Sequence, residues 1–89
     1  MNAFTKNKIS NNYELIAREL KRVRTGAKIS LAKAAKDTGI GERYLAALES
    51  GRFDRLPEGV YGKNFLKQYA LYLKLDGPAL VRLYEEDAA

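Results

Sequence analysis

The sequence contains no cysteine and no histidine, and these two absences restrict the chemistry open to the protein. Without cysteine, the chain has neither disulfide bonds nor thiolate ligands for a metal ion. Without histidine, it lacks the commonest general base and the commonest metal ligand, so only carboxylate chemistry remains for an enzyme. Carboxylate pairs such as Glu42 with Glu49 and Glu85 with Glu86 are expected to be solvated on helix surfaces or at a frayed helix end. The sequence therefore predicts a protein without catalytic activity, cofactor or metal ion.

Long apolar runs are also missing. No segment approaches the length of about 20 residues that is needed to cross a bilayer. The first residues, MNAFTKNKISNN, lack the apolar centre of a secretory signal. These absences predict a cytoplasmic protein. In a longer parent protein with a membrane anchor, the same expectation places the domain at the cytoplasmic face of the inner membrane.

The charge that is present is concentrated in the first part of the chain. The net charge is +5 over 89 residues. Residues 1–36 hold nine basic and two acidic side chains, a balance of +7, which leaves −2 for residues 37–89. A basic segment can attract nucleic acid, an anionic lipid surface or an acidic protein face. Charge alone does not choose among these partners, and an ordinary solvated basic surface is the competing interpretation.

Apolar residues recur at helical spacing along the chain, and no stretch alternates with the period of two that marks a strand. We expect residues 1–11 to form a flexible N-terminal tail and residues 12–89 to form a single domain. In the first helix, Asn11 and Glu14 resemble a capping box, and Gly26 is a natural stop. The expected helices cover residues 12–25, 31–38, 42–50, about 60–74 and about 77 onward.

The second and third of these helices have the form of a helix-turn-helix. Ser30 can cap the second helix, and Gly39 begins the glycine-containing turn that follows it. In the third helix, Leu45 and Leu48 lie one turn apart and are expected in the core. Residues 52–59 are then a connector, because a proline excludes the residue before it from helical dihedrals.

A DNA-binding helix-turn-helix reads base edges with its second helix and contacts phosphates around it. In the positions expected to face outward, this sequence has Glu42, Ala46 and Ala47, which offer few hydrogen bonds to bases. Arg43 is the one good reader of guanine, and nearby basic side chains can add weak, salt-sensitive phosphate contacts. The residues of this DNA-binding hypothesis are Lys28, Lys33, Arg43 and Arg52. Ordinary solvation of these four side chains is the competing interpretation.

The fourth helix carries more apolar surface than a small bundle requires. A stripe of about 100° is enough to pack a surface helix, whereas the apolar arc here covers about half of the circumference. The arc consists of Tyr61, Phe65, Leu66, Tyr69, Ala70, Tyr72 and Leu73. Tyr69 is central in the arc and is expected in the core, whereas Tyr61, Phe65 and Tyr72 lie along one edge. We favour exposure of Tyr61 and Phe65 as anchors for a partner protein, against the alternative that all the rings are buried.

Two stretches resemble known families. Residues 29–51, ISLAKAAKDTGIGERYLAALESG, resemble the helix-turn-helix of phage repressors of the Cro and lambda-repressor type. Residues 43–76, RYLAALESGRFDRLPEGVYGKNFLKQYALYLKLD, are more specifically similar to the cytoplasmic domain of the RodZ cell-shape family. The run from ALESGRFDRLP into VYGKNFLKQYALYL is the most specific part, because phage-type repressors do not normally continue in this way. The resemblance implies an all-α, five-helix, lambda-repressor-like bundle.

The RodZ resemblance also implies a partner. Members of that family bind the bacterial actin homologue MreB, largely through aromatic residues of the fourth helix that correspond to Tyr61 and Phe65. To this partner-binding site we add Tyr72, together with Lys63 and Arg55 as charge contacts for an acidic partner. The alternative function is a DNA-binding transcriptional regulator of the Cro type.

The sequence departs from the family pattern at two positions. Asn64 stands where glycine usually precedes the aromatic residue, and Gly41 stands where a capping serine is usual. Full-length members continue into a transmembrane helix and a periplasmic domain. We therefore expect either an excised domain or a free-standing relative.

Overall fold

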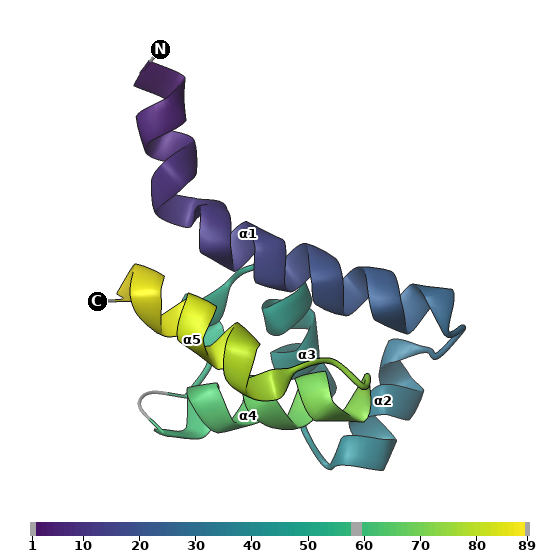
Figure 1. Ribbon diagram of the computed structural model, residues 1–89. Helices are drawn as coiled ribbons and strands as arrows, with labels where there is room; N and C mark the ends of the chain where they lie inside the picture. Colours follow the sequence, from purple (N-terminus) through teal and green to yellow (C-terminus); the bar gives the residue numbers. More distant parts are fainter. Residues whose placement is uncertain (1, 58–59, 89) are drawn as a thin grey trace.

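The computed structural model describes the backbone of residues 2–57 and 60–88, and the side chains of residues 12–57 and 62–86. Over these residues the chain forms five α-helices and one short 3-10 helix, with no strand (Figure 1). The elements are α1 (Asn2–Gly26), α2 (Leu31–Thr38), α3 (Glu42–Glu49), η1 (Phe53–Arg55), α4 (Val60–Tyr72) and α5 (Gly77–Ala88). The predicted all-α, five-helix fold is confirmed.

The start of α1 differs from the prediction. The helix begins at Asn2 rather than at residue 12, so Asn11 lies inside the helix and does not cap it. The first turns project away from the other helices (Figure 1), whereas later turns carry the buried Ile16 and Leu20. A helix extends readily from a packed segment into a polar flank, because each further residue adds one backbone hydrogen bond. Hydrophobic periodicity does not detect such turns, and the flexibility of residues 1–11 stays a prediction.

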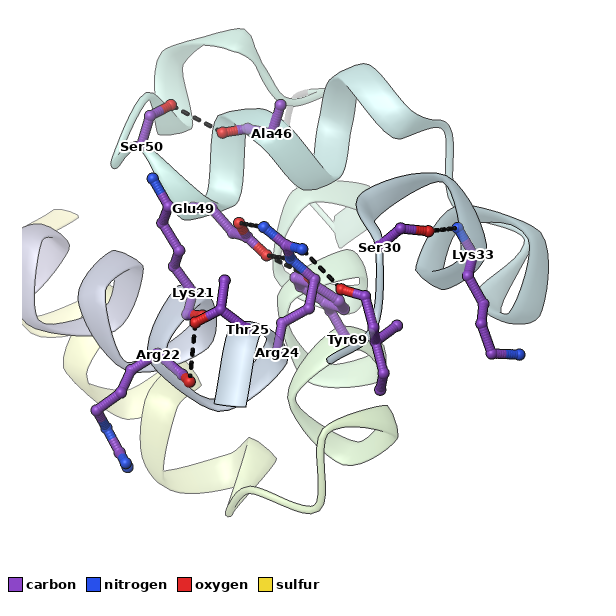
Figure 2. Close-up of polar contacts among 11 residues, drawn as sticks. Lys21, Arg22, Arg24, Thr25, Ser30, Lys33, Ala46, Glu49, Ser50 and Tyr69 are labelled. Carbon is purple, nitrogen blue, oxygen red and sulfur yellow. Dashed lines mark hydrogen bonds and ion pairs between the residues drawn. The ribbon is translucent and has the colours of Figure 1, made fainter. Parts of the chain in front are cut away.

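Local signals set the ends of α2 and α3. The Ser30 hydroxyl accepts a hydrogen bond from the Lys33 backbone N–H at 3.0 Å, which caps α2 as predicted (Figure 2). Gly39 ends α2 with a φ of 78°, a left-handed conformation that favours glycine. Gly41 precedes α3 without a side-chain cap. The helix-turn-helix therefore lies at its predicted position.

The core combines side chains from α1 to α4 and from the connector around η1. Leu45 and Leu48 of α3 are fully buried, as predicted. Ala47 is also buried, with 5% of its surface exposed, so the prediction that it faces outward is wrong. Its side chain belongs to the core cluster, and its carbonyl accepts a hydrogen bond from the Arg52 backbone N–H at 2.9 Å in the turn that follows α3. The main core residues are Ile16, Leu20, Ala34, Ile40, Leu45, Leu48, Phe53, Leu56, Leu66, Tyr69, Ala70 and Leu73.

The last helix, α5, closes the bundle against α1 and α4 (Figure 1). An Asp76 carboxylate oxygen accepts a hydrogen bond from the Ala79 backbone N–H at 3.1 Å, which caps the start of α5. The ring of Tyr84 lies with its centroid 5.6 Å from that of Tyr13 in α1 and 5.2 Å from that of Phe53 in η1. These three rings hold the connector between the first and last helices, and the connector leads directly into α4.

Candidate partner-binding surface

The residues of α4 lie in two different environments. Tyr69, Leu66 and Leu73, the centre of the predicted arc, are buried. Phe65 and Tyr72, at the predicted edge, are partly buried and pack against the core, so Phe65 is less exposed than predicted. The side chain of Tyr61 lies outside the described residues, so its exposure stays a prediction. Along the part of α4 that the structure describes, the aromatic edge is thus distinct from the helix centre.

Phe65 packs beside α3 at this edge. Its ring centroid lies 5.5 Å from that of Tyr44, and the two ring planes are tilted by 41°. Offset ring pairs of this kind contribute about 0.5–1.5 kcal/mol beyond the area that they bury. Gly62 helps to set this position, because a Cβ atom there would lie 3.0 Å from the Pro57 carbonyl oxygen. The absence of a side chain at residue 62 lets the start of α4 approach the connector closely.

Tyr72 connects the same edge of α4 to α2. Its hydroxyl donates a hydrogen bond to an Asp37 carboxylate oxygen at 2.6 Å. The Lys33 ammonium lies 3.1 Å from the same carboxylate. The Tyr72 hydroxyl, and then Lys33, lower the pKa of Asp37, and the bond to Asp37 raises the pKa of Tyr72. The side-chain oxygen of Tyr72 is thus engaged within the domain.

The two basic residues predicted beside the aromatic edge lie in different places. Lys63 forms an ion pair with Glu85 of α5 at 3.0 Å. At 100° per residue, it leaves α4 on the side away from Phe65, so the structure does not bring Lys63 to the aromatic edge. Arg55 is exposed on η1 and lines a pocket of about 400 Å³ together with Arg43 and Tyr44. The structure therefore groups Arg55 with α3.

Two residues of the DNA-binding hypothesis form ion pairs within the domain. Lys33 pairs with Asp37, and Arg52 lies 3.4 Å from an Asp54 carboxylate oxygen. Lys28 is exposed in the turn after α1, where it has a φ of 61°. Exposed ion pairs contribute only about 0–1 kcal/mol, so they do not by themselves prevent contacts with phosphate. DNA binding by these residues stays a hypothesis.

The fourth residue of that hypothesis, Arg43, contacts its neighbour in the chain. The Arg43 guanidinium carbon lies 5.0 Å from the centroid of the Tyr44 ring, and one guanidinium nitrogen donates to the Tyr44 hydroxyl at 3.1 Å. Tyr44 thus contacts both Arg43 and Phe65. Tyr44 was not among the predicted site residues, although it comes three residues after Gly41 in the first turn of α3.

A charged network behind α3 was also missed. The Arg24 guanidinium donates to the two carboxylate oxygens of Glu49 at 2.6 and 2.9 Å and to the Ile29 carbonyl at 2.7 Å. The Tyr69 hydroxyl donates to the same Glu49 carboxylate. Figure 2 shows Arg24 and Tyr69 converging on Glu49 from α1 and α4. The network therefore joins three helices through one carboxylate.

The expectation that Glu49 is a solvated carboxylate is wrong. Its side chain is only 6% exposed, and that of Arg24 is 13% exposed. Residue 49 follows the buried Leu45 by one helical turn and so lies on the same face of α3. This spacing is the feature of the sequence that could have indicated the burial of Glu49. Burial, followed by the hydrogen bond to Glu49, raises the pKa of Tyr69 above its ordinary value of 10.0. The network holds α3 against α1 and α4 and so positions Tyr44.

No helix in the described part of the chain combines the length and the apolar character required to cross a membrane.

The family model described as "Helix-turn-helix domain" matches residues 19–80, which extend from the packed part of α1 into α5. Over 59 residues, 66% of this chain, it is 39% identical to the "Uncharacterized membrane protein YmfM" of Bacillus subtilis (strain 168). Over 70 residues, 79% of this chain, it is 34% identical to the "Cytoskeleton protein RodZ" of Streptococcus pneumoniae (strain ATCC BAA-255 / R6). The matches cover only 20% and 25% of these two relatives. No solved structure gives a significant match. The chain therefore belongs to this helix-turn-helix family and carries a domain of the RodZ type.

Proposed function

We propose that this domain is a non-enzymatic interaction module that binds the bacterial actin homologue MreB and supports the maintenance of cell shape. The observation that carries the proposal is the position of Phe65, half-buried on Tyr44 at the edge of α4, one turn before the fully buried Tyr69. The similarity to a protein named as a RodZ cytoskeleton protein supports this class of partner. In a longer protein, we place the domain at the cytoplasmic face of the inner membrane.

The aromatic edge has the physical character of a binding anchor. Binding hot spots are enriched in large side chains that are held rigidly and become fully buried on association. The Phe65 ring is already held by Tyr44 within the free domain, so little side-chain entropy is lost when a partner covers it. Tyr61 precedes it by one helical turn, and the proposed site includes both residues. Tyr72 and Arg55 extend this site, whereas Lys63 lies on the other side of α4.

The proposal is tested by co-sedimentation of the domain with MreB filaments. We expect the double variant Tyr61→Ala, Phe65→Ala to bind at least about thirtyfold more weakly, as the loss of a hot spot predicts. Leu71→Ala is the matched control, because Leu71 is also on α4 and is 53% exposed, but lies away from the aromatic edge. Circular dichroism verifies that both variants remain folded. Wild-type affinity in a folded double variant would exclude this location of the site.

DNA binding is the second candidate function, and the confirmed helix-turn-helix with an exposed Arg43 favours it. A specific regulator is expected to bind its own site at least about a thousandfold more tightly than other DNA at physiological salt. Selection from random duplexes, followed by a salt titration, measures this ratio. An enriched sequence that loses affinity in an Arg43→Ala variant supports the regulator, and the absence of a preferred sequence excludes it.

A further inference from the structure

The pocket between α3 and η1 adjoins the aromatic edge of α4. Its volume is about 400 Å³, and its described lining consists of Arg43, Tyr44 and Arg55. Tyr44 also packs against Phe65, so one ring separates the pocket from the proposed anchor. Both charged residues among this described lining are arginines. The pocket therefore combines positive charge with an aromatic wall directly beside the surface proposed for the partner.

The first of these cations is held in place before any ligand arrives. Arg43 lies over the Tyr44 ring at 5.0 Å and donates to the Tyr44 hydroxyl at 3.1 Å. A stacked guanidinium that forms one hydrogen bond still has several N–H donors for a further acceptor. Restricting its conformations in the free domain reduces the entropy that binding would cost. Arg43 is thus oriented as a donor at the pocket.

The second cation has no competing partner within the described part of the chain. Arg55 is exposed on η1, and no hydrogen bond or ion pair of its side chain occurs among the residues described. Its neighbour Arg52 differs, since Arg52 is paired with Asp54. η1 is itself fixed by the buried ring of Phe53. The Arg55 guanidinium is therefore available for an anionic group that enters between the two arginines.

We propose that this pocket binds the carboxylate of a glutamate or aspartate side chain on the partner protein, with Arg43 and Arg55 as its two donors. This inference rests on the proposed function, because the carboxylate belongs to the protein whose apolar surface covers Phe65. Arginine forks match the planar geometry of a carboxylate and give strong charge-assisted hydrogen bonds. Arg43 thereby moves from the DNA-binding hypothesis to the protein-binding surface.

The surroundings of the pocket favour one acidic side chain over a nucleic acid backbone. Each arginine is preceded in the chain by an exposed acid, Glu42 before Arg43 and Asp54 before Arg55. Successive phosphates of a nucleic acid along this surface are repelled by these two carboxylates. A single carboxylate can enter between the arginines. A volume of about 400 Å³ also leaves room for the carbon chain that carries the carboxylate. The chemistry thus fits an acidic position on a protein.

The test compares Arg43→Gln, Arg55→Gln with the matched double variant Arg18→Gln, Arg82→Gln. The control removes the same charge from α1 and α5, where both arginines are exposed. Binding to MreB filaments is measured across a salt titration. We expect the pocket variant to bind about tenfold more weakly at low salt and to depend less on salt than the wild type, with the control within about twofold. Equal affinities and salt slopes for the two double variants would overturn the assignment.

A second measurement separates this inference from the proposed function. Pentaglutamate is added to the labelled domain, and the Nε–Hε resonances of arginine are followed by NMR. We expect saturable shifts of Arg43 and Arg55, with Arg18 and Arg82 unchanged. If the wild type does not bind MreB filaments, the proposed function fails, and saturable shifts then identify the pocket as a carboxylate site for another acidic partner. Uniform or absent shifts overturn the pocket itself.

Discussion

Tyr69 and Phe65 lie one turn apart on α4, yet they face different surroundings. Tyr69 is fully buried, and its hydroxyl reaches the Glu49 carboxylate. Phe65 is half-buried, with Tyr44 on one side. One helix thus has a centre that closes the core and an edge that remains partly open. The comparison shows that one aromatic-rich helix can stabilise the fold at its centre and leave a partly exposed edge, on which we propose partner binding.

The same contrast separates the two sides of α3. On the side that faces α1, Arg24, Glu49 and Tyr69 form a network that is largely shielded from water. On the other side, Tyr44 contacts Phe65 of α4 and the exposed Arg43 contacts Tyr44. The rigid side that faces α1 keeps the residues on the other side in a defined position, which lowers the entropy that binding would cost. The expected effects of substitution differ accordingly.

The largest loss of stability is expected for Tyr69→Ala. Truncating a buried aromatic side chain costs about 3–5 kcal/mol, and this variant also removes a hydrogen bond to Glu49. Phe65→Ala is expected to cost less, because the ring is partly exposed. Urea unfolding monitored by circular dichroism measures both values. Equal losses would show that Phe65 is a core residue like Tyr69.

The next loss of stability is expected for Glu49→Ala, which should lower the free energy of unfolding by about 3 kcal/mol. The substitution leaves the Arg24 guanidinium, which is 13% exposed, without its counter-charge. Glu42→Ala on the same helix is the control, since Glu42 is exposed and its loss is expected to change stability by at most about 0.5 kcal/mol. Urea unfolding of both variants measures the difference. Similar values would mean that the network contributes no more than a surface charge.

A smaller, pH-dependent loss of stability is expected in alkaline solution. The pKa of Tyr69 is raised above 10.0 in the folded domain, so folding favours the protonated hydroxyl. This contribution is fully present below the unfolded pKa of 10.0 and is lost as the pH rises toward the folded value. Unfolding of the wild type and Tyr69→Phe is compared below and above that pH. The difference between them is expected to shrink at the higher pH, and a constant difference would contradict this account.

The smallest effect is expected for Tyr72→Phe, which removes only the hydroxyl that contacts Asp37. A hydrogen bond between exposed groups contributes about 1 kcal/mol or less. The Asp37 pKa should rise toward its ordinary value of 3.8, because the donor that lowers it most is gone. NMR titration of the Asp37 carboxyl measures this shift. An unchanged pKa would show that Lys33 alone holds it low.

Much of the fold was predictable because its signals are local. Helical periodicity, the Ser30 cap and the turn at Gly39 were sufficient to place α2 and α3. The start of α1 was not predictable, because the polar turns that extend the packed part of this helix carry no hydrophobic pattern. Glu49 was also misplaced, because its partners come from α1 and α4, and Ala47 was misplaced because it joins the buried core cluster. Such contacts between distant segments cannot be inferred from spacing along one helix.

The candidate site shows the same limit. The central position of Tyr69 and the edge position of Phe65 on α4 follow from the helical rotation of about 100° per residue. The pocket of Arg43, Tyr44 and Arg55 does not, because it forms where α3 meets η1. From the sequence, Arg43 belongs to the DNA-binding hypothesis and Arg55 to the partner-binding site, and only the tertiary arrangement brings them together.

The most direct test of the central claim is an NMR map of the surface that MreB contacts. The labelled domain is titrated with an assembly-deficient MreB subunit, and backbone amide shifts are assigned along the chain. We predict that the largest changes cluster at residues 43–44, at residue 55 and along residues 61–65. Changes centred instead on Glu42 and Ala46 of α3 and on Ser50 directly after it, or spread over α1, would contradict the assignment of binding to the edge of α4.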